Sequence, residues 1–296
     1  MSDVVWQGLT GPGLDQQLNL RARWPGHQAV LDRWAESSAA VRAALPPPLE
    51  LAYGAHPLQR IDLHPLAREG APAPLLVFIH GGYWQGLDKS DFSFLVPTFL
   101  EAGIAVASVN YRMAPEVRMA EIAADITAAL DLLQEAAPAQ GCAPDFVLSG
   151  HSAGGHLAVL ELVRERLAVA AGTMAARTRA CCSISGVYDL APIRHSYQQP
   201  VLRVAEREVA ELSPLRRAPA SAPPLLLALG EWETAEFVRQ QNAMAAHWQA
   251  LDLPVESRRV PEADHFTVVD ALSAADHPLT RWLLRACLAG DGRRDP

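Results

Sequence analysis

Basic residues are too few in this sequence to suggest binding to nucleic acid. Its 296 residues include 25 Lys and Arg against 33 Asp and Glu, which gives a net charge of −8 at pH 7. A protein that neutralises phosphates needs a basic stripe or patch on its surface. The charge balance therefore argues against a nucleic-acid partner.

Long hydrophobic runs are also missing, and we expect no secretory leader. The first residues, Met1 to Trp6, have neither the cationic region nor the apolar stretch of a signal peptide. The apolar run from Pro223 to Gly230 is too short to span a bilayer. We expect no membrane partner.

Cysteine is scarce, and its positions follow no metal-binding or disulfide pattern. The four cysteines are Cys142, Cys181, Cys182 and Cys287. Without a regular spacing, they are best interpreted as reduced and mostly buried thiols, which predicts a cytoplasmic protein. The sequence contains no internal repeat.

What the chain does have is hydrophobic sequence in short alternating segments. Hydrophobic residues make up 50% of the chain, enough for one large domain over residues 1–296. Strands are predicted at Leu49–Tyr53, Gln59–Leu63, Pro74–His80, Ile104–Asn110, Asp145–Ser149, Ala180–Ser185, Pro224–Gly230 and Val255–Val260. Helices are predicted at Ser93–Ala102, Arg118–Ala136, Gly154–Arg166, Glu236–Leu251 and Leu279–Leu288.

Strands that alternate with helices predict an α/β fold with a mostly parallel central sheet and helices on both faces. Residues 1–50 have a polar-faced helical pattern that ends at three consecutive prolines. Residues 191–222 are rich in Arg, Glu and Pro and interrupt the alternation. We expect the first segment to form N-terminal helices and the second a small helical cap.

The most informative motif is the pentapeptide Gly150-His-Ser-Ala-Gly154. It follows an apolar strand and precedes a helical segment, as in the nucleophile elbow of an α/β-hydrolase. Such a turn exposes the serine hydroxyl and directs the N-terminus of the next helix at the reaction centre. The motif predicts that Ser152 is a nucleophile.

A nucleophilic serine needs a histidine base and an acid that orients it, in the chain order Ser, acid, His. His265 follows the last predicted strand, whereas His195, His247 and His277 are less well placed. The acid should follow the strand that ends at Gly230. Its candidates are Glu231, Glu233 and Glu236, and Glu233 is favoured by its distance from the strand end.

The loop after the predicted strand Pro74–His80 contains paired glycines in His80-Gly-Gly-Tyr-Trp84. Glycines let the backbone turn its amides toward a substrate. The predicted oxyanion hole consists of the amides of Gly82, Tyr83 and Ala153. Aromatic residues near these loops are candidates for substrate binding: Tyr83, Trp84, Trp232 and Tyr188.

Three histidines near these motifs could be mistaken for metal ligands. His80, His151 and His156 lack the spacing of a zinc motif. His80 is interpreted as bracing its loop, and His156 as packing on the helix that follows Ser152. We expect no metal and no other cofactor.

Several motifs together resemble the hormone-sensitive-lipase-like branch of the α/β-hydrolases, and within it the serine-type arylformamidases, or kynurenine formamidases. The shared elbow and glycine loop are accompanied by Asn19-Leu-Arg-Ala-Arg23, Asn110-Tyr-Arg-Met-Ala-Pro-Glu116, Ser185-Gly-Val-Tyr-Asp-Leu190, Glu211-Leu-Ser-Pro-Leu215, Glu236-Phe-Val-Arg-Gln240 and Asp264-His-Phe266. One position departs from the family, which usually carries Asp where this chain has Glu233.

The resemblance implies cleavage of an N-formyl aryl amide such as N-formylkynurenine, in the context of tryptophan catabolism. A carboxylesterase acting on short acyl or aryl esters is the alternative, because the same catalytic groups serve both reactions. A binding protein on a hydrolase scaffold is a third hypothesis. The expected partner is a small aryl formamide or ester, and a homodimer is left open.

Overall fold

The computed structural model describes residues 3–66 and 70–289. The strands are β1 (Val4–Trp6), β2 (Leu9–Thr10), β3 (Leu49–Ala52), β4 (Arg60–His64), β5 (Ala73–Ile79), β6 (Ala105–Val109), β7 (Cys142–His151), β8 (Thr178–Ile184), β9 (Leu225–Gly230) and β10 (Val255–Val260). The α-helices are α1 (Gly11–Leu18), α2 (Leu20–Arg23), α3 (His27–Ala44), α4 (Val96–Glu101), α5 (Met119–Ala136), α6 (Ala153–Ala170), α7 (Ala191–Arg194), α8 (Gln199–Leu202), α9 (Glu206–Leu212), α10 (Ala235–Ala250) and α11 (Pro278–Leu288). Short 3₁₀ helices are η1 (Lys89–Leu95), η2 (Ala137–Gln140), η3 (Pro214–Arg216) and η4 (Thr267–Ser273).

Eight strands form one twisted sheet in the order β10-β9-β8-β7-β5-β6-β4-β3. Among the first six strands in this order, β10 through β6, each neighbouring pair is parallel. β4 pairs antiparallel with both β6 and β3. This confirms the predicted α/β-hydrolase fold with a mostly parallel sheet. β5 is fully buried along its length because helices cover both faces of the sheet.

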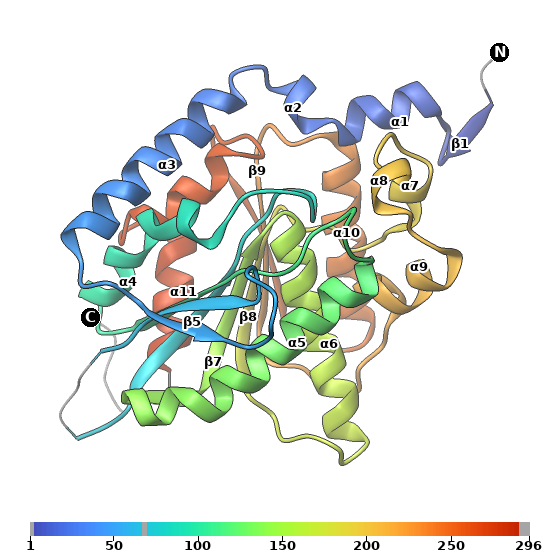
Figure 1. The fold of residues 1–296 in the computed structure, drawn as a ribbon. Coiled ribbons are helices and arrows are strands. Elements are labelled where there is room, and N and C mark those ends of the chain that lie inside the picture. Colours follow the sequence, from blue (N-terminus) through green and yellow to red (C-terminus); the bar gives the residue numbers. More distant parts are fainter. Residues whose placement is uncertain (1–2, 67–69, 290–296) are drawn as a thin grey trace.

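Helices lie on both sides of the sheet (Figure 1). α5 and α6 pack together on one face, and α4 and α11 lie on the other, where α3 lies outside η1. α5 packs through apolar residues spaced three or four apart, among them Ile122, Ile126 and Leu133. No helix in the described ranges is long and apolar enough to cross a membrane.

Two segments differ from the simplest sequence interpretation. Residues 4–10 form the antiparallel pair β1–β2 before the N-terminal helices begin. The helix predicted at Ser93–Ala102 divides into η1 and α4, with Pro97 in the first turn of α4.

The segment 191–222 holds α7, α8, α9 and η3, and α1 and α2 cross the top of the molecule beside it (Figure 1).

Candidate active site

Ser152 lies in a sharp turn between β7 and α6. Its φ of 55° and ψ of −117° place it in a region that non-glycine residues rarely occupy, the strained backbone of a nucleophile elbow. Its amide donates a hydrogen bond of 2.8 Å to the carbonyl of Ile184 at the end of β8. The turn is thus anchored to the sheet, and α6 begins with the next residue.

The glycines around Ser152 are required by close backbone contacts. A Cβ on Gly150 would lie 2.3 Å from the carbonyl oxygen of Gly154. A Cβ on Gly154 would lie 2.0 Å from the carbonyl oxygen of Ile79, the last residue of β5. α6 therefore packs directly against the end of β5, and this holds Ser152 beside the loop that follows that strand.

His265 and Glu233 extend a chain of hydrogen bonds from Ser152. The Oγ of Ser152 lies 3.0 Å from Nε2 of His265, and Nδ1 of His265 lies 2.7 Å from Oε1 of Glu233. A carboxylate only accepts, so Nδ1 carries the proton and Nε2 is free to accept from the hydroxyl. The side chains of His265 and Glu233 are 3% and 0% exposed. This is the arrangement of a serine-hydrolase triad.

The two other candidate acids are engaged elsewhere. Glu231 accepts a hydrogen bond of 3.0 Å from the amide of Glu262 at the surface. Glu236 pairs with Arg239, whose Nη2 lies 2.6 Å from Oε1. Glu233 alone of the three contacts the histidine that lies beside Ser152.

His151 braces the loop that carries His265. Its Nε2 donates a 2.8 Å hydrogen bond to the carbonyl of His265, and the two rings lie 5.0 Å apart. Burial, followed by the effect of neighbouring His265, lowers the pKa of His151 to about 3. His151 is therefore neutral near pH 7 and links the elbow to the histidine loop without adding charge.

The glycine loop packs against the elbow in an unusual backbone conformation. Gly82, Tyr83 and Trp84 have φ values of 104°, 51° and 57°. A Cβ on Gly82 would lie 2.1 Å from the carbonyl oxygen of Gly86, so the loop requires glycine there. Within the described residues, no protein acceptor takes the amide protons of Gly82, Tyr83 or Ala153. These amides remain available to an oxyanion.

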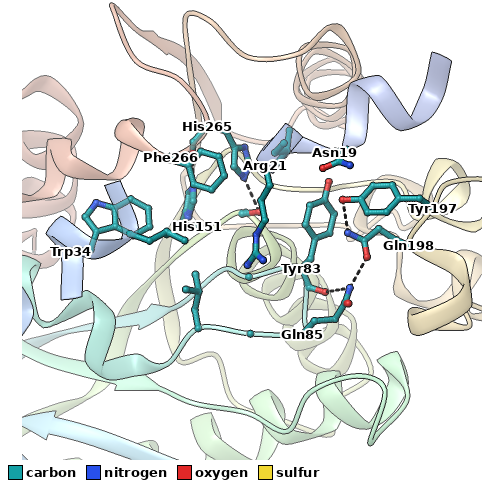
Figure 2. Close-up of a pocket in the computed structure, with 16 residues that line it drawn as sticks. Asn19, Arg21, Trp34, Tyr83, Gln85, His151, Tyr197, Gln198, His265 and Phe266 are labelled. Atoms are coloured by element: carbon teal, nitrogen blue, oxygen red, sulfur yellow. Dashed lines mark hydrogen bonds between the residues drawn. The ribbon is translucent and has the colours of Figure 1, made fainter. Parts of the chain in front are cut away.

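A cavity of about 340 Å³ opens onto Ser152 and His265. Figure 2 shows Trp34 and Phe266 on one side of it and Tyr83, Tyr197 and Gln198 on the other. Tyr83 also donates a hydrogen bond to the carbonyl of Leu18, which ties the glycine loop to the N-terminal helices. The cavity can accommodate a small molecule with an aromatic part.

Three of the four aromatic residues predicted to bind substrate lie outside this cavity. Trp84 is fully buried and packs edge-on to His156, with ring centroids 5.2 Å apart. Tyr188 is also buried, and its hydroxyl donates to Oγ of Ser183 at 2.9 Å. Trp232 points outward and is 54% exposed. These three side chains do not line the cavity beside Ser152, because their backbone directs them into the core or into solvent. Tyr83 does line the cavity.

Sequence reasoning missed several residues that line the cavity: Asn19, Arg21, Leu31, Trp34, Tyr197, Gln198 and Phe266. Phe266 could have been found, because it follows the predicted base. The N-terminal residues had a signal only in the motif Asn19-Leu-Arg-Ala-Arg23.

The histidines considered as metal ligands have other partners. Nδ1 of His80 donates to the carbonyl of Gly81 at 2.8 Å, and its ring stacks on Tyr111. Nε2 of His156 donates to the carbonyl of Leu212 at 2.8 Å. In the part of the chain that the structure describes, no cluster of three or more His, Cys, Asp or Glu side chains could hold a metal ion.

Known proteins have sequences and folds similar to those of this chain. The BD-FAE family model matches residues 61–245. Kynurenine formamidase from Danio rerio is 25% identical over 96% of this chain and 98% of its own length. Kynurenine formamidase from Salmo salar is 27% identical over 80% of this chain and 81% of its own length.

The crystal structure of a candidate thioesterase from Silicibacter sp. TM1040 has a TM-score of 0.78 at 31% identity, covering 90% of this chain and 97% of that one. The metagenomic carboxylesterase EstE1, at 19% identity and a TM-score of 0.64 over 89% of this chain and 95% of its own, shares the fold. The chain belongs to the BD-FAE family of α/β-hydrolases and is a hydrolase homologous to the kynurenine formamidases.

Proposed function

We propose that this enzyme hydrolyses an N-formyl aryl amide, such as N-formylkynurenine, to formate and an aryl amine. The observation that carries the proposal is the buried chain Ser152–His265–Glu233 at a cavity with aromatic walls. Its substrate is supported by the kynurenine formamidase from Danio rerio, which matches 96% of this chain. The depth of the nucleophile, which is 4% exposed, favours a small acyl group such as formyl.

In the proposed first half-reaction, Oγ of Ser152 attacks the formyl carbon while its proton passes to Nε2 of His265. Glu233 holds the imidazole by Nδ1 and stabilises its positive charge. The amides of Gly82, Tyr83 and Ala153 bind the oxyanion, each contributing about 3 kcal/mol to the transition state. His265 then protonates the nitrogen as the C–N bond breaks. The aryl amine leaves, and the formyl group remains on Oγ of Ser152.

Water completes the cycle by the same groups. His265 takes a proton from the water molecule as its oxygen attacks the formyl-serine, and the second tetrahedral intermediate uses the same amides. Its collapse returns the proton to Oγ of Ser152 and releases formate. The enzyme's own groups are sufficient for each proton transfer.

A carboxylesterase acting on short acyl or aryl esters is the second candidate. The same triad cleaves esters, and the 31% identical Silicibacter protein is a candidate thioesterase. The two functions differ in the ratio of kcat/KM for an N-formyl arylamine to that for an aryl acetate.

The deciding experiment is hydrolysis of N-formylkynurenine by the purified enzyme, with phenyl acetate assayed in parallel. We expect deformylation to exceed ester cleavage, and Ser152→Ala to reduce both by at least about a thousandfold. Fast ester cleavage with negligible deformylation would assign the enzyme to the esterases. Failure of a fluorophosphonate to label Ser152 would instead indicate a binding protein.

We also propose a cytoplasmic location. Cys142, Cys181, Cys182 and Cys287 are free and buried, as suits a reducing compartment.

A further inference from the structure

The wall of the cavity beside Ser152 carries one fixed charge. Among its sixteen described lining residues, Arg21 is the only Lys, Arg, Asp or Glu side chain. His151, also in the wall, is neutral near pH 7 because burial lowers its pKa to about 3. A single cation in an otherwise uncharged cavity favours a ligand with one negative group.

The backbone beneath Arg21 is held in place. Arg21 lies in α2, whose N-terminus is capped by Oδ1 of Asn19, at 3.2 Å from the amide of Ala22. The neighbouring Leu20 is buried, and Tyr83 hydrogen bonds to the carbonyl of Leu18 just before the cap. Figure 2 shows the guanidinium of Arg21 directed into the cavity. The cation is thus presented to the cavity by a fixed segment.

Arg21 has no acidic partner within residues 3–66 and 70–289 at ion-pair distance, and it donates no hydrogen bond there. Asp15, which like Arg21 lies near Tyr197, instead accepts a hydrogen bond of 2.7 Å from the amide of Tyr197. The guanidinium can therefore bind an incoming carboxylate without first breaking an ion pair.

The rest of the wall divides into polar and apolar sides. Nε2 of Gln85 donates to Oε1 of Gln198 at 2.6 Å, and Nε2 of Gln198 donates to the hydroxyl of Tyr197 at 2.8 Å. The apolar side chains of the lining include Leu31, Trp34, Leu87 and Phe266. An aromatic ring fits the apolar side, and a charged substituent on it would meet Arg21.

We infer that Arg21 is a specificity-determining residue, and that it binds a carboxylate on the leaving-group part of an aryl formamide substrate. The formyl group in this inference rests on the proposed function. The preference for a carboxylate does not depend on that function. The planar guanidinium can hold a carboxylate through two hydrogen bonds. Because Arg21 is exposed to solvent, we expect a preference of about tenfold rather than several thousandfold.

The test uses a formanilide whose ortho-acyl chain ends in a carboxylate, and the same compound with that carboxylate converted to a primary amide. The readout is the ratio of kcat/KM for the two, so that effects on the common chemistry cancel. The matched aryl acetate esters, one with the carboxylate and one with the amide, are assayed in the same way.

In the wild-type enzyme we expect the carboxylate to be preferred about tenfold, and the preference to fall at high salt. Arg21→Met should bring the ratio near one, and Arg21→Lys should retain part of it. Arg23→Met is the matched control. Arg23 lies on the same helix but outside this cavity, over the ring of Trp24, so its replacement should leave the ratio as in wild type.

Two results would overturn the inference: a wild-type ratio near one, or a ratio that Arg21→Met leaves unchanged. If neither formamide is cleaved but the esters are, the proposed formamidase function fails. The ratio within the ester pair then still decides the role of Arg21.

Discussion

At the scale of single residues, Glu233 stands where the resemblance to the arylformamidases implies Asp, and both of its carboxylate oxygens have hydrogen-bond donors. Its Oε1 lies 2.7 Å from Nδ1 of His265, while Oε2 lies 3.3 Å from the amide of Thr234. The loop is fixed by a 3.0 Å hydrogen bond from the amide of Trp232 to the carbonyl of Ala263. The side chain of Trp232, the neighbouring residue in this loop, turns outward into solvent.

Replacing Glu233 by Gln tests its proposed role. The amide removes the charge that stabilises protonated His265 and can favour the wrong tautomer, so we expect kcat to fall by about a thousandfold or more. Steady-state kinetics on the preferred substrate measure the loss, and circular dichroism checks the fold. Glu231→Gln is the control, because the carboxylate of Glu231 accepts a hydrogen bond from the amide of Glu262 at the surface. A larger loss in that control would move the acid role to Glu231.

Shortening the same side chain gives a graded test. Glu233→Asp withdraws the carboxylate by about one bond length from Nδ1 of His265, a hydrogen bond that is now 2.7 Å long. We expect an intermediate fall in kcat, smaller than that of the Gln variant. Activity equal to wild type would show that the loop adjusts to either acid.

At the scale of elements, the contact between α6 and β5 fixes the distance between Ser152 and the glycine loop. Gly154 lets the first turn of α6 rest on the end of β5, and Gly81 lets its loop rest on the elbow, where a Cβ would lie 2.9 Å from the carbonyl oxygen of His151. The register of β5 with β7, which pairs Ile79 with Gly150, starts both loops at the same level. Geometry at Ser152 therefore depends on backbone packing.

Gly154→Ala should damage both stability and activity. The added Cβ would meet the carbonyl oxygens of Ile79 and His80 at 2.0 Å and 2.5 Å, so α6 must move away from β5. We expect a loss of about 3 kcal/mol in the free energy of unfolding and slower labelling of Ser152 by a fluorophosphonate. Gly26→Ala is the matched control, since a Cβ added there would meet no atom within 4 Å. Labelling of the Gly154→Ala variant at the wild-type rate would contradict the close contact.

At the scale of the whole molecule, buried neutral histidines link stability to pH. Burial lowers the pKa of His151 to about 3 and that of His156 to about 4, and it also lowers the pKa of His80. Unfolding returns these groups to an ordinary value near 6.5. The unfolded chain then binds more protons than the native one, so stability is full above about pH 6.5 and falls as the pH drops toward 4.

His156 offers the clearest test of this linkage. At pH 5 its depressed pKa costs the native state up to about 2 kcal/mol relative to pH 7. Its only side-chain hydrogen bond among the described residues, to the carbonyl of Leu212 at 2.8 Å, can be kept by a glutamine. We expect His156→Gln to reduce the fall in Tm between pH 7 and pH 5 by about 4 °C. An unchanged fall, measured by calorimetry, would rule out this contribution.

The fall in Tm must be compared between wild type and the His156→Gln variant, because other groups change the stability in the opposite direction. Burial raises the pKa of Glu161, so the native state takes up a proton there more readily as the pH falls. The difference between wild type and variant isolates the histidine.

Much of the fold and the candidate catalytic residues could be predicted from the sequence, because both are encoded locally. The alternation of apolar strands and helices predicts a parallel sheet, whose carboxyl ends meet at one edge. Ser152, Glu233 and His265 each follow such a strand end, so their proximity follows from topology. The Gly-rich motifs mark the two turns that need close backbone contact.

The rest of the cavity could not be predicted, because it depends on how distant segments cross. Arg21 and Trp34 reach the cavity only because α1 to α3 pass over the strand ends. The directions of Trp84 and Trp232 follow from the backbone of their turns. Trp84, for example, has a φ of 57°, and no periodicity in the sequence reveals it.

The wide spacing of the site along the chain has a consequence for synthesis on the ribosome. Ser152 and His265 are separated by 113 residues, and β9 and β10 must both form before the histidine loop can close on the elbow. At about 5–20 residues per second, the histidine is made roughly 6–23 s after the serine. During that interval the nascent chain holds Ser152 without the histidine that we propose as its base, so we expect no hydrolysis until His265 has been translated and β10 has formed.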